Sequence, residues 1–465
     1  MQNKILFKNA KAIVSCDEQD KVYYDVDMLV EGPKITKIEK DIDATDCELI
    51  DAKEMFIYPG LVNTHHHFFQ TFVRNLITID YPNMLVVEWL DKIYRIFEKI
   101  DSDVIYYSSL TAMADLIKHG CTTAFDHQYC YSKATGKSPV DRQMEAAKML
   151  GIRYHAGRGT NTLPRSYGST MPDNMLETTD EFINDCIRII DLYHDPNPFS
   201  MSQIVVSPCQ PMNSFKETFT ESIALARDKK VKMHTHLGEG ENVIMIERYG
   251  KRTVDWCEEI GFLGEDVWIA HGWELNEQEY KVMGQTKTGV SHCPAPAVLG
   301  GFPILDIIAM QKENVLISLG CDGSATNDSS SLIDSLRMAY LMQANHSKER
   351  GGSISAYDML KIATINGAKT LGRSDIGSLE IGKAADLFAI KTNKLELSGM
   401  LHDPKNMLAR GGVTGNVDMT MINGKVVYKD NALINIDEER LAKEGEEVCT
   451  KVLRNTCDAF SSFKY

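Results

Sequence analysis

Short hydrophobic runs separated by turn-like residues occupy the first 58 residues of the chain. The runs at 5–7, 11–14, 27–30, 34–38 and 49–51 have the spacing that is typical of β-strands. No helical period appears before Pro59-Gly60. The N-terminal part is therefore predicted to consist of strands.

From Pro59-Gly60 onward, the pattern repeats strand, loop and helix. Apolar runs predict strands at 61–67, 122–126, 152–156, 204–207, 231–237, 267–271, 289–292 and 315–321. Helical periods are found at 103–118, 141–150, 179–192, 220–228, 253–260, 277–285, 304–312, 332–345 and 356–366, and a further helix is expected at 86–97. Eight strands that alternate with helices predict a parallel (β/α)8 barrel.

Strand patterns return after residue 373. They occur at 386–390, 419–422 and 425–428, with Asn423-Gly424 as a hairpin signal, and 438–460 has a helical pattern. We therefore predict an α/β protein with two domains. A TIM-like barrel spans 59–373, and a small β-sandwich domain with a C-terminal helix is built from 1–58 and 374–465.

Charge and composition narrow the class of partner. The chain has 50 Lys and Arg against 65 Asp and Glu, a net charge of −15, whereas nucleic acids and acidic membranes require clustered positive charge. We find no signal peptide and no apolar stretch near the ~20 residues that span a bilayer. Eleven cysteines without a CxxC pair indicate reduced thiols. We expect a cytoplasmic protein that binds a small molecule and neither nucleic acid nor membrane.

Two predicted barrel strands carry closely spaced histidines. His65 and His67 share one face of the first strand, and His66 points away from it. On the fifth strand, His236 is nearer the C-terminal end and is the better ligand candidate, whereas His234 lies deeper. Converging imidazoles suit Zn²⁺ or Fe²⁺. The roles of His66 and His234 stay open.

Three further titratable residues follow apolar runs at the ends of predicted strands. Glu239 lies just past strand five, His271 ends strand six and Asp322 ends strand eight. The C-terminal ends of barrel strands are where such enzymes perform their chemistry. A carboxyl group above a metal is placed to move protons. Together with the histidines, these residues predict a metal-assisted hydrolytic site.

These motifs resemble those of the amidohydrolase superfamily, in the same order along the chain. The segments are PGLVNTHHH at 59–67, HLGE at 236–239, AHG at 270–272, CDGSA at 321–325 and the stretch 376–387. The resemblance covers essentially the whole chain and indicates the metal-dependent deaminase branch, which includes proteins similar to triazine hydrolases and cytosine deaminases. Members of this superfamily are often homo-oligomers, so the resemblance implies that this protein is a homo-oligomer.

The resemblance implies a set of ligands and a mechanism. One divalent ion per chain, zinc in preference to iron, would be held by His65, His67, His236 and Asp322. A two-metal relative would carry a Lys at the end of strand four, and residues 204–209 contain none. In the implied mechanism Asp322 accepts a proton from water, Glu239 protonates a ring nitrogen, His271 stabilises the developing oxyanion, and ammonia leaves.

The segment after the first metal motif bears on the substrate. Residues 65–71 followed by Arg74 look most like 8-oxoguanine deaminases, which implies conversion of 8-oxoguanine to urate and ammonia. Gln70 could hydrogen-bond a purine edge or simply the backbone. Cys209 lies where relatives contact the ring, and Trp273 could stack on the ring or pack in the core.

Several alternatives stay open. Residues 292–301 lack the polar run that relatives carry after strand seven, so guanine, isoxanthopterin, another aminopurine or pterin, and a triazine-type substrate are further candidates. Ring-opening amide hydrolysis usually needs two metals, and the absent Lys argues against it. A metal-binding protein without catalysis is the alternative from a different class.

Overall fold

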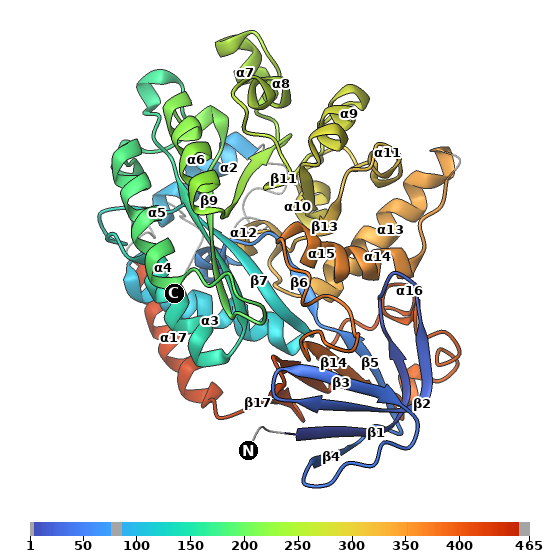
Figure 1. The fold of residues 1–465 in the computed structure, drawn as a ribbon. Helices are drawn as coiled ribbons and strands as arrows, with labels where there is room; N and C mark the ends of the chain where they lie inside the picture. Colours follow the sequence, from blue (N-terminus) through green and yellow to red (C-terminus); the bar gives the residue numbers. More distant parts are fainter. Residues whose placement is uncertain (1–3, 76–85, 351, 455–465) are drawn as a thin grey trace.

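The computed structural model describes residues 4–75, 86–350 and 352–454, and its strands form two separate sheets (Figure 1). One sheet has eight strands in the order in which they occur along the chain, and the other has nine strands drawn from both ends of the chain. The predicted fold class, a (β/α)8 barrel with a β-domain made from both termini, is confirmed.

The eight-stranded sheet is parallel throughout and wraps into the barrel. Its strands are β6 (Leu61–Asn63), β7 (Cys121–Gln128), β8 (Arg153–Thr160), β9 (Ser202–Pro208), β10 (Lys232–Leu237), β11 (Val267–His271), β12 (Gly289–His292) and β13 (Ile317–Leu319). Two backbone hydrogen bonds close the ring at the ends of its first and last strands. The N–H of Thr64, just after β6, donates to the carbonyl of Leu319, and the N–H of Asp322, just after β13, donates to the carbonyl of His65. This closure places the first metal motif beside Asp322.

Helices follow the barrel strands and surround them (Figure 1). They are α2 (Val86–Phe97), α3 (Ser102–Lys118), α4 (Pro139–Leu150), α5 (Thr179–Tyr193), α6 (Lys216–Lys229), α7 (Asn242–Tyr249), α8 (Thr253–Glu259), α9 (Glu277–Thr286), α10 (Pro294–Leu299), α11 (Ile307–Lys312), α12 (Ser324–Asn327), α13 (Leu332–Arg350), α14 (Ala356–Ile362) and α15 (Ile365–Thr370). None of the helices in the described ranges combines the length and apolar character needed to cross a membrane.

The structure differs from the predicted elements at several points. The first barrel strand ends at Asn63, so the three histidines lie in the extended loop beyond it. The helix predicted at 356–366 is divided into α14 and α15 at Ala363 and Thr364, because Thr364 leaves helical geometry with φ −128° and ψ −92°. Helix α7 was not predicted, because it is short and exposes Val243 and Ile246, which obscures its helical period.

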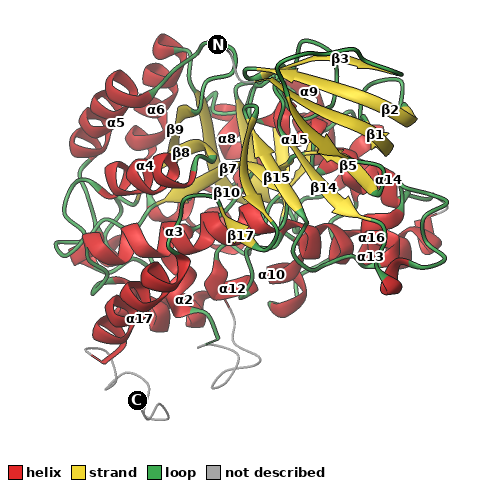
Figure 2. Ribbon diagram, turned by 90° about the horizontal axis from the view of Figure 1, so that it is seen from below, coloured by secondary structure: helices red, strands yellow, loops and turns green. Residues whose placement is uncertain are grey.

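The second sheet combines strands from both ends of the chain (Figure 2). Its order is β17-β16-β15-β14-β5-β1-β2-β3, with β4 beside β1. The bounds are β1 (Lys4–Val14), β2 (Val22–Glu31), β3 (Lys34–Glu39), β4 (Glu48–Asp51), β5 (Met55–Pro59), β14 (Leu387–Lys391), β15 (Met419–Ile422), β16 (Lys425–Lys429) and β17 (Ala432–Leu433). A bulge between Phe7 and Ala10 divides β1 into the two runs that the sequence predicts.

The two sheets meet where β5 continues almost directly into β6. β5 was not predicted because all five of its residues are buried, so its sequence does not alternate. Helix α16 (Met407–Gly411) and the C-terminal helix α17 (Glu438–Arg454) complete the described chain. α17 packs on α3 through a hydrogen bond from Tyr107 to Glu444, and the predicted helical residues 455–460 lie outside the described residues. The domain boundaries at 58/59 and 373/374 remain predictions.

Candidate active site

The predicted metal ligands come together at the C-terminal end of the barrel. The ring nitrogens of His65, His67 and His236 form a buried group of candidate ligand atoms, all within 4.8 Å of one another. Asp322 Oδ1 lies 3.3 Å from His65 Nε2 and 3.5 Å from His67 Nε2. Four side chains from β10 and from the loops after β6 and β13 therefore meet at one point.

The outward nitrogen of each histidine is held by a hydrogen bond that fixes its tautomer. His67 Nδ1 donates to the carbonyl of His127 at 2.8 Å, and His236 Nδ1 donates to the carbonyl of Cys209 at 2.9 Å. A carbonyl can only accept, so the proton is on Nδ1 and the Nε2 lone pair is directed inward. This is the arrangement that orients imidazoles toward a metal.

The converging lone pairs fit a divalent cation. His67 Nε2 and His236 Nε2 are 3.1 Å apart, and both are acceptors, so direct contact between them is repulsive. Tetrahedral ligands at ~2.0–2.1 Å from zinc would be about 3.3 Å from one another, close to the distances seen here. Burial lowers the pKa of His65 and His236 to about 3, which keeps both rings neutral and able to ligate.

The backbone at two site residues is unusual. His271 has φ 76° and Asp322 has φ 65°, both in the left-handed region that β-strand residues avoid. Such conformations are costly and cluster at functional sites. Gly320, two residues before Asp322, allows the loops after β6 and β13 to approach each other closely, because a Cβ at this position would lie 2.8 Å from the Cβ of His65.

Glu239 and His271 lie beside the ligand group. His271 Nε2 is 3.4 Å from Glu239 Oε1, and His271 Nδ1 is 4.0 Å from Asp322 Oδ2, so the imidazole lies between the two carboxyl groups. Gln210 donates to Glu239 Oε2 at 2.8 Å. Burial, together with the nearby charges of Asp322 and Glu241, raises the pKa of Glu239 well above its ordinary value. Glu239 is thereby suited to donate a proton.

The predicted substrate-binding residues all line this end of the barrel. Gln70, in the 3-10 helix η1 (Phe68–Val73), donates to Tyr129 Oη at 3.3 Å and accepts from the N–H of Ala325 at 3.4 Å, so its amide is already used within the protein. Cys209 is buried, with its Sγ 3.9 Å from His236 Nδ1. These two residues shape the wall of the site.

Trp273 forms another part of that wall. Its ring lies 4.3 Å from the ring of His271 and 4.7 Å from that of Phe302, measured between centroids. Its Nε1 is buried and finds no acceptor among the described residues. Trp273 therefore offers an unused donor next to His271.

The two histidines whose roles stayed open have distinct surroundings. His234 Nε2 lies 2.9 Å from His65 Nδ1, beneath the ligand group. His66 points the opposite way, where its Nε2 lies 2.9 Å from Ser330 Oγ and its ring packs on Phe68. Of the three consecutive histidines, His65 and His67 thus belong to the ligand group, whereas His66 packs outside it.

Two residues that support the site were not predicted. His127 is the second-last residue of β7, and its carbonyl accepts the hydrogen bond from His67 Nδ1. The carboxylate of Glu241 is buried and accepts hydrogen bonds from the N–H groups of Gly238 and Glu239, both at 2.7 Å. The position of His127 after an apolar run could have identified it, but nothing in the sequence around Glu241 distinguishes it from a solvated loop residue.

Comparisons with known proteins agree with this geometry. Over 459 residues the chain is 46% identical to hydroxydechloroatrazine ethylaminohydrolase of Pseudomonas sp. strain ADP, covering 96% of this chain and 95% of that protein. It is 34% identical over 390 residues to 8-oxoguanine deaminase of Pseudomonas aeruginosa, covering 83% and 85%. Atrazine chlorohydrolase from Arthrobacter aurescens TC1, solved with zinc, matches with a TM-score of 0.91 at 28% identity, covering 96% of this chain and 100% of that one.

The family assignment rests on most of the chain. Residues 56–427 match the model of the amidohydrolase family, a range that includes the whole barrel and, from the second sheet, β14, β15 and most of β5 and β16. The histidine-rich group at the barrel mouth is the site that a metal-dependent hydrolase requires. The chain therefore belongs to the amidohydrolase family and is a metal-dependent hydrolase that acts on carbon–nitrogen bonds.

Proposed function

We propose that the enzyme hydrolytically removes an exocyclic amino group from an oxo-substituted nitrogen heterocycle. The observation that carries the proposal is the placement of His271 between Glu239 and Asp322, directly beside the converging Nε2 atoms of the histidines. Two carboxyl groups linked by an imidazole can deliver one proton and accept another, which amine displacement by water requires.

His65, His67, His236 and Asp322 are the proposed ligands of one divalent ion, with zinc preferred. Such an ion supplies Lewis acidity, which lowers the pKa of water toward ~7. At the end of β9, the position where a two-metal relative would have a Lys is occupied by Ser207 and Pro208. This composition supports a single ion.

The chain's own residues account for the proton transfers. Asp322 takes one proton from the attacking water and passes it to the departing nitrogen. Glu239 protonates the ring nitrogen next to the carbon under attack, and the second proton of the water restores Glu239 when the intermediate collapses. His271 stabilises the negative charge that develops on oxygen. The products are the ring lactam and a free amine.

Two relatives support two substrate groups. The 46% identity over nearly the full length to a hydroxydechloroatrazine ethylaminohydrolase favours a hydroxylated triazine that carries an alkylamino group. The segment at 65–74 and the 34% identity to an 8-oxoguanine deaminase favour 8-oxoguanine, with urate and ammonia as products. We rank the triazine first because that similarity is higher and covers more of both chains.

A substrate panel tests the proposal. Zinc-loaded protein is incubated with an N-ethylamino hydroxytriazine, 8-oxoguanine, guanine and isoxanthopterin, and released amine is quantified. We expect turnover of at least one compound and none with Glu239→Gln. If no compound releases amine above that control, the proposed function is wrong. If 8-oxoguanine is turned over faster than the triazine, the ranking reverses while the chemistry stands.

A further inference from the structure

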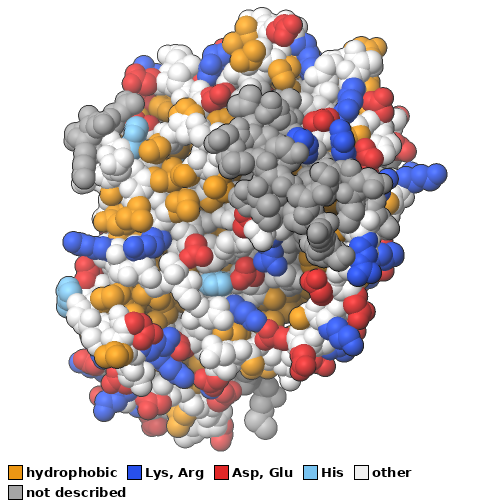
Figure 3. Space-filling view, turned by 180° about the vertical axis from the view of Figure 1, so that it is seen from behind, with side chains coloured by type: hydrophobic (Ala, Val, Ile, Leu, Met, Phe, Trp, Pro, Cys, Tyr) orange, Lys and Arg blue, Asp and Glu red, His pale blue; other side chains and the backbone are white. Residues whose placement is uncertain are grey.

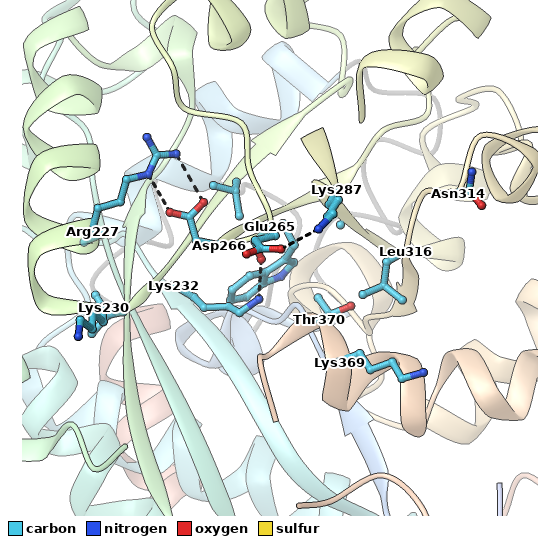
Figure 4. Close-up of a pocket in the computed structure, with 15 residues that line it drawn as sticks. Arg227, Lys230, Lys232, Glu265, Asp266, Lys287, Asn314, Leu316, Lys369 and Thr370 are labelled. Atoms are coloured by element: carbon cyan, nitrogen blue, oxygen red, sulfur yellow. Dashed lines mark hydrogen bonds and ion pairs between the residues drawn. The ribbon is translucent and has the colours of Figure 1, made fainter. Parts of the chain in front are cut away.

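A cavity of about 620 Å³ opens at the end of the barrel opposite the histidine group (Figure 4). It lies where β10, β11 and β12 begin, and its lining includes Lys232, Trp268 and Gly289 from these strands. This size is within the range of cavities that hold small ligands. The opposite end of a barrel from the catalytic mouth ordinarily serves stability, so a cavity of this size there calls for an explanation.

Positive charge gathers around this cavity. Its lining contains five cationic side chains, those of Arg227, Lys230, Lys232, Lys287 and Lys369. It also contains the carboxylates of Glu265 and Asp266. Elsewhere the two signs are mixed, as the face in Figure 3 shows, and the whole chain carries −15. A concave surface with an excess of positive charge within an acidic protein concentrates the local field.

Each of the two carboxylates is paired with another cation of the lining. Arg227 Nε lies 2.9 Å from Asp266 Oδ2, and Lys287 Nζ lies 3.2 Å from Glu265 Oε2 (Figure 4). These pairs leave three ammonium groups around the cavity without a carboxylate of the lining to balance them.

Lys232 is the most constrained of the three. It is half-buried, and its Nζ donates to the backbone carbonyl of Glu265 at 2.9 Å. Within the described ranges, no carboxylate oxygen lies within 4.0 Å of that nitrogen, and its one hydrogen bond to a protein acceptor is the one to Glu265, so two of its three N–H donors have no protein partner there. Its stem lies on Gly372, which has φ 74° and where a Cβ would come within 2.6 Å of Lys232 Cε. Burial lowers the pKa of Lys232, and the nearby carboxylates only partly oppose this effect.

The other two ammonium groups are more exposed. Lys230 forms the left-handed C-cap of α6 and has no ion pair with any described carboxylate. Lys369 lies 3.9 Å from Glu18, whose side chain is 85% exposed, and such a surface pair contributes little. Together with Lys232, these groups supply cationic donors from three separate elements around one cavity.

We propose that this cavity binds a small, multiply charged oxyanion that carries phosphate or carboxylate groups. Such a ligand would satisfy the free donors of Lys232 and relieve the mutual repulsion of the three ammonium groups. Lysine is well suited to oxyanions because it acts as a compact charge with rotatable donors. Binding there would stabilise the barrel by mass action.

Calorimetric titration of the zinc-loaded protein with inorganic pyrophosphate, and separately with citrate, at constant ionic strength tests the proposal. We expect saturable binding of at least one of them, weakened about tenfold or more by Lys232→Met or Lys230→Met. Lys312→Met, on α11 outside the lining, is the matched control and leaves the affinity unchanged. The two titrants distinguish a phosphate ligand from a carboxylate ligand.

Lys230→Met is not expected to disturb folding, since Lys230 is exposed. A loss of affinity in this variant therefore reflects the loss of its charge. Melting temperatures without ligand verify that each variant is folded. Absence of saturable binding of both titrants at millimolar concentration overturns the proposal. So does an affinity that stays the same in both lysine variants. Amine release remains unchanged in all three variants, because the cavity lies at the far end of the barrel.

Discussion

His234 Nε2 lies 2.9 Å from His65 Nδ1, and this contact determines which nitrogen of His65 faces the ligand group. His234 Nδ1 donates to the carbonyl of Trp268 at 3.0 Å, so its proton is on Nδ1 and its Nε2 must accept. His65 Nδ1 is therefore the donor, and the lone pair of His65 Nε2 points toward Asp322. A chain of two buried hydrogen bonds orients a proposed metal ligand from below.

Replacing His234 with Leu is expected to weaken zinc binding about 10- to 100-fold, the usual effect of removing a group that orients a metal ligand. His66→Leu is the matched control, because His66 is equally buried but bonds to Ser330 outside the site. Competition with a chelator of known affinity measures both constants. Equal zinc affinity in the two variants would contradict the role of His234.

Glu241→Gln is expected to lower kcat about 10- to 100-fold with little change in KM. The carboxylate holds the N–H groups of Gly238 and Glu239, and an amide can accept only one of these bonds. A shift of about 1 Å in Glu239 is sufficient for a loss of this size. Steady-state amine release gives both constants.

Glu247→Gln serves as the control for Glu241→Gln, since Glu247 is exposed on α7, the helix that Glu241 immediately precedes. Its kinetics are expected to match those of the wild type. A normal kcat for Glu241→Gln in a folded protein would show that the two hydrogen bonds do not position Glu239.

The periodic pattern of apolar and polar residues explains why the barrel could be predicted and which strands could not. The eight barrel strands are apolar runs set between helices, so their order follows from the sequence even where their ends shift. β5 reads Met55 to Pro59, is buried throughout, and has no alternation to detect. The histidines of the first motif lie beyond β6, yet His65 and His67 still converge because the loop remains extended.

The support of the site could not be predicted in the same way. The motifs identify residue types at strand ends, but the orientation of His65 depends on a contact with His234, 169 positions away. The role of Glu241 depends on the direction of two N–H groups in a tight loop. Such relationships are set by the three-dimensional path of the chain and leave no periodic signal.

Trp273→Phe tests whether the unused indole donor binds substrate. Phe retains a ring beside His271 and Phe302. It removes Nε1–H, which is buried without a protein acceptor among the described residues, together with part of the apolar indole ring. We expect KM to rise about tenfold, the value of one neutral hydrogen bond, with kcat nearly unchanged. Trp256→Phe, a buried tryptophan on α8, controls for the general effect of the substitution. Unchanged KM would exclude this contact.

Asp126 makes stability depend on pH. Burial raises the pKa of Asp126 to about 7, although the N–H of Phe68 and the amide of Gln143 partly oppose this by donating to its carboxylate. Below about pH 4 the carboxyl is protonated in both the folded and unfolded states. Between about pH 4 and 7 only the unfolded state releases the proton, so the free energy of unfolding falls, by up to about 4 kcal/mol.

Asp126→Asn remains neutral and is expected to remove this part of the pH dependence. The difference in unfolding free energy between variant and wild type should therefore grow in favour of Asn as pH rises from 4.5 to 8. Urea unfolding at a series of pH values measures this difference. Asp228→Asn is the control, because Asp228 is an exposed residue of α6. A difference that does not change with pH would mean that Asp126 ionises normally in the folded protein.

The ion pair between Arg153 and Asp386 connects the two sheets. Arg153, the first residue of β8, is fully buried, and its Nε and Nη2 donate to the Asp386 carboxylate at 3.0–3.1 Å. Asp386 also accepts from the N–H of Asn423 in the β15–β16 turn, 2.7 Å away. One carboxylate thereby holds both a barrel strand and a hairpin of the second sheet.

Asp386→Leu is expected to lower the free energy of unfolding by about 3–5 kcal/mol, because it leaves the Arg153 guanidinium buried without its counter-charge. Adding Arg153→Met should recover much of the loss, since two apolar side chains need no partner, and urea unfolding of the single and double variants measures the coupling between them. Amine release per folded molecule should remain at the wild-type level, as the pair lies near the start of β8, away from the histidine group. A loss below about 1 kcal/mol in Asp386→Leu would mean that water or the carbonyl groups of Phe199 and Ser200 are sufficient partners for Arg153.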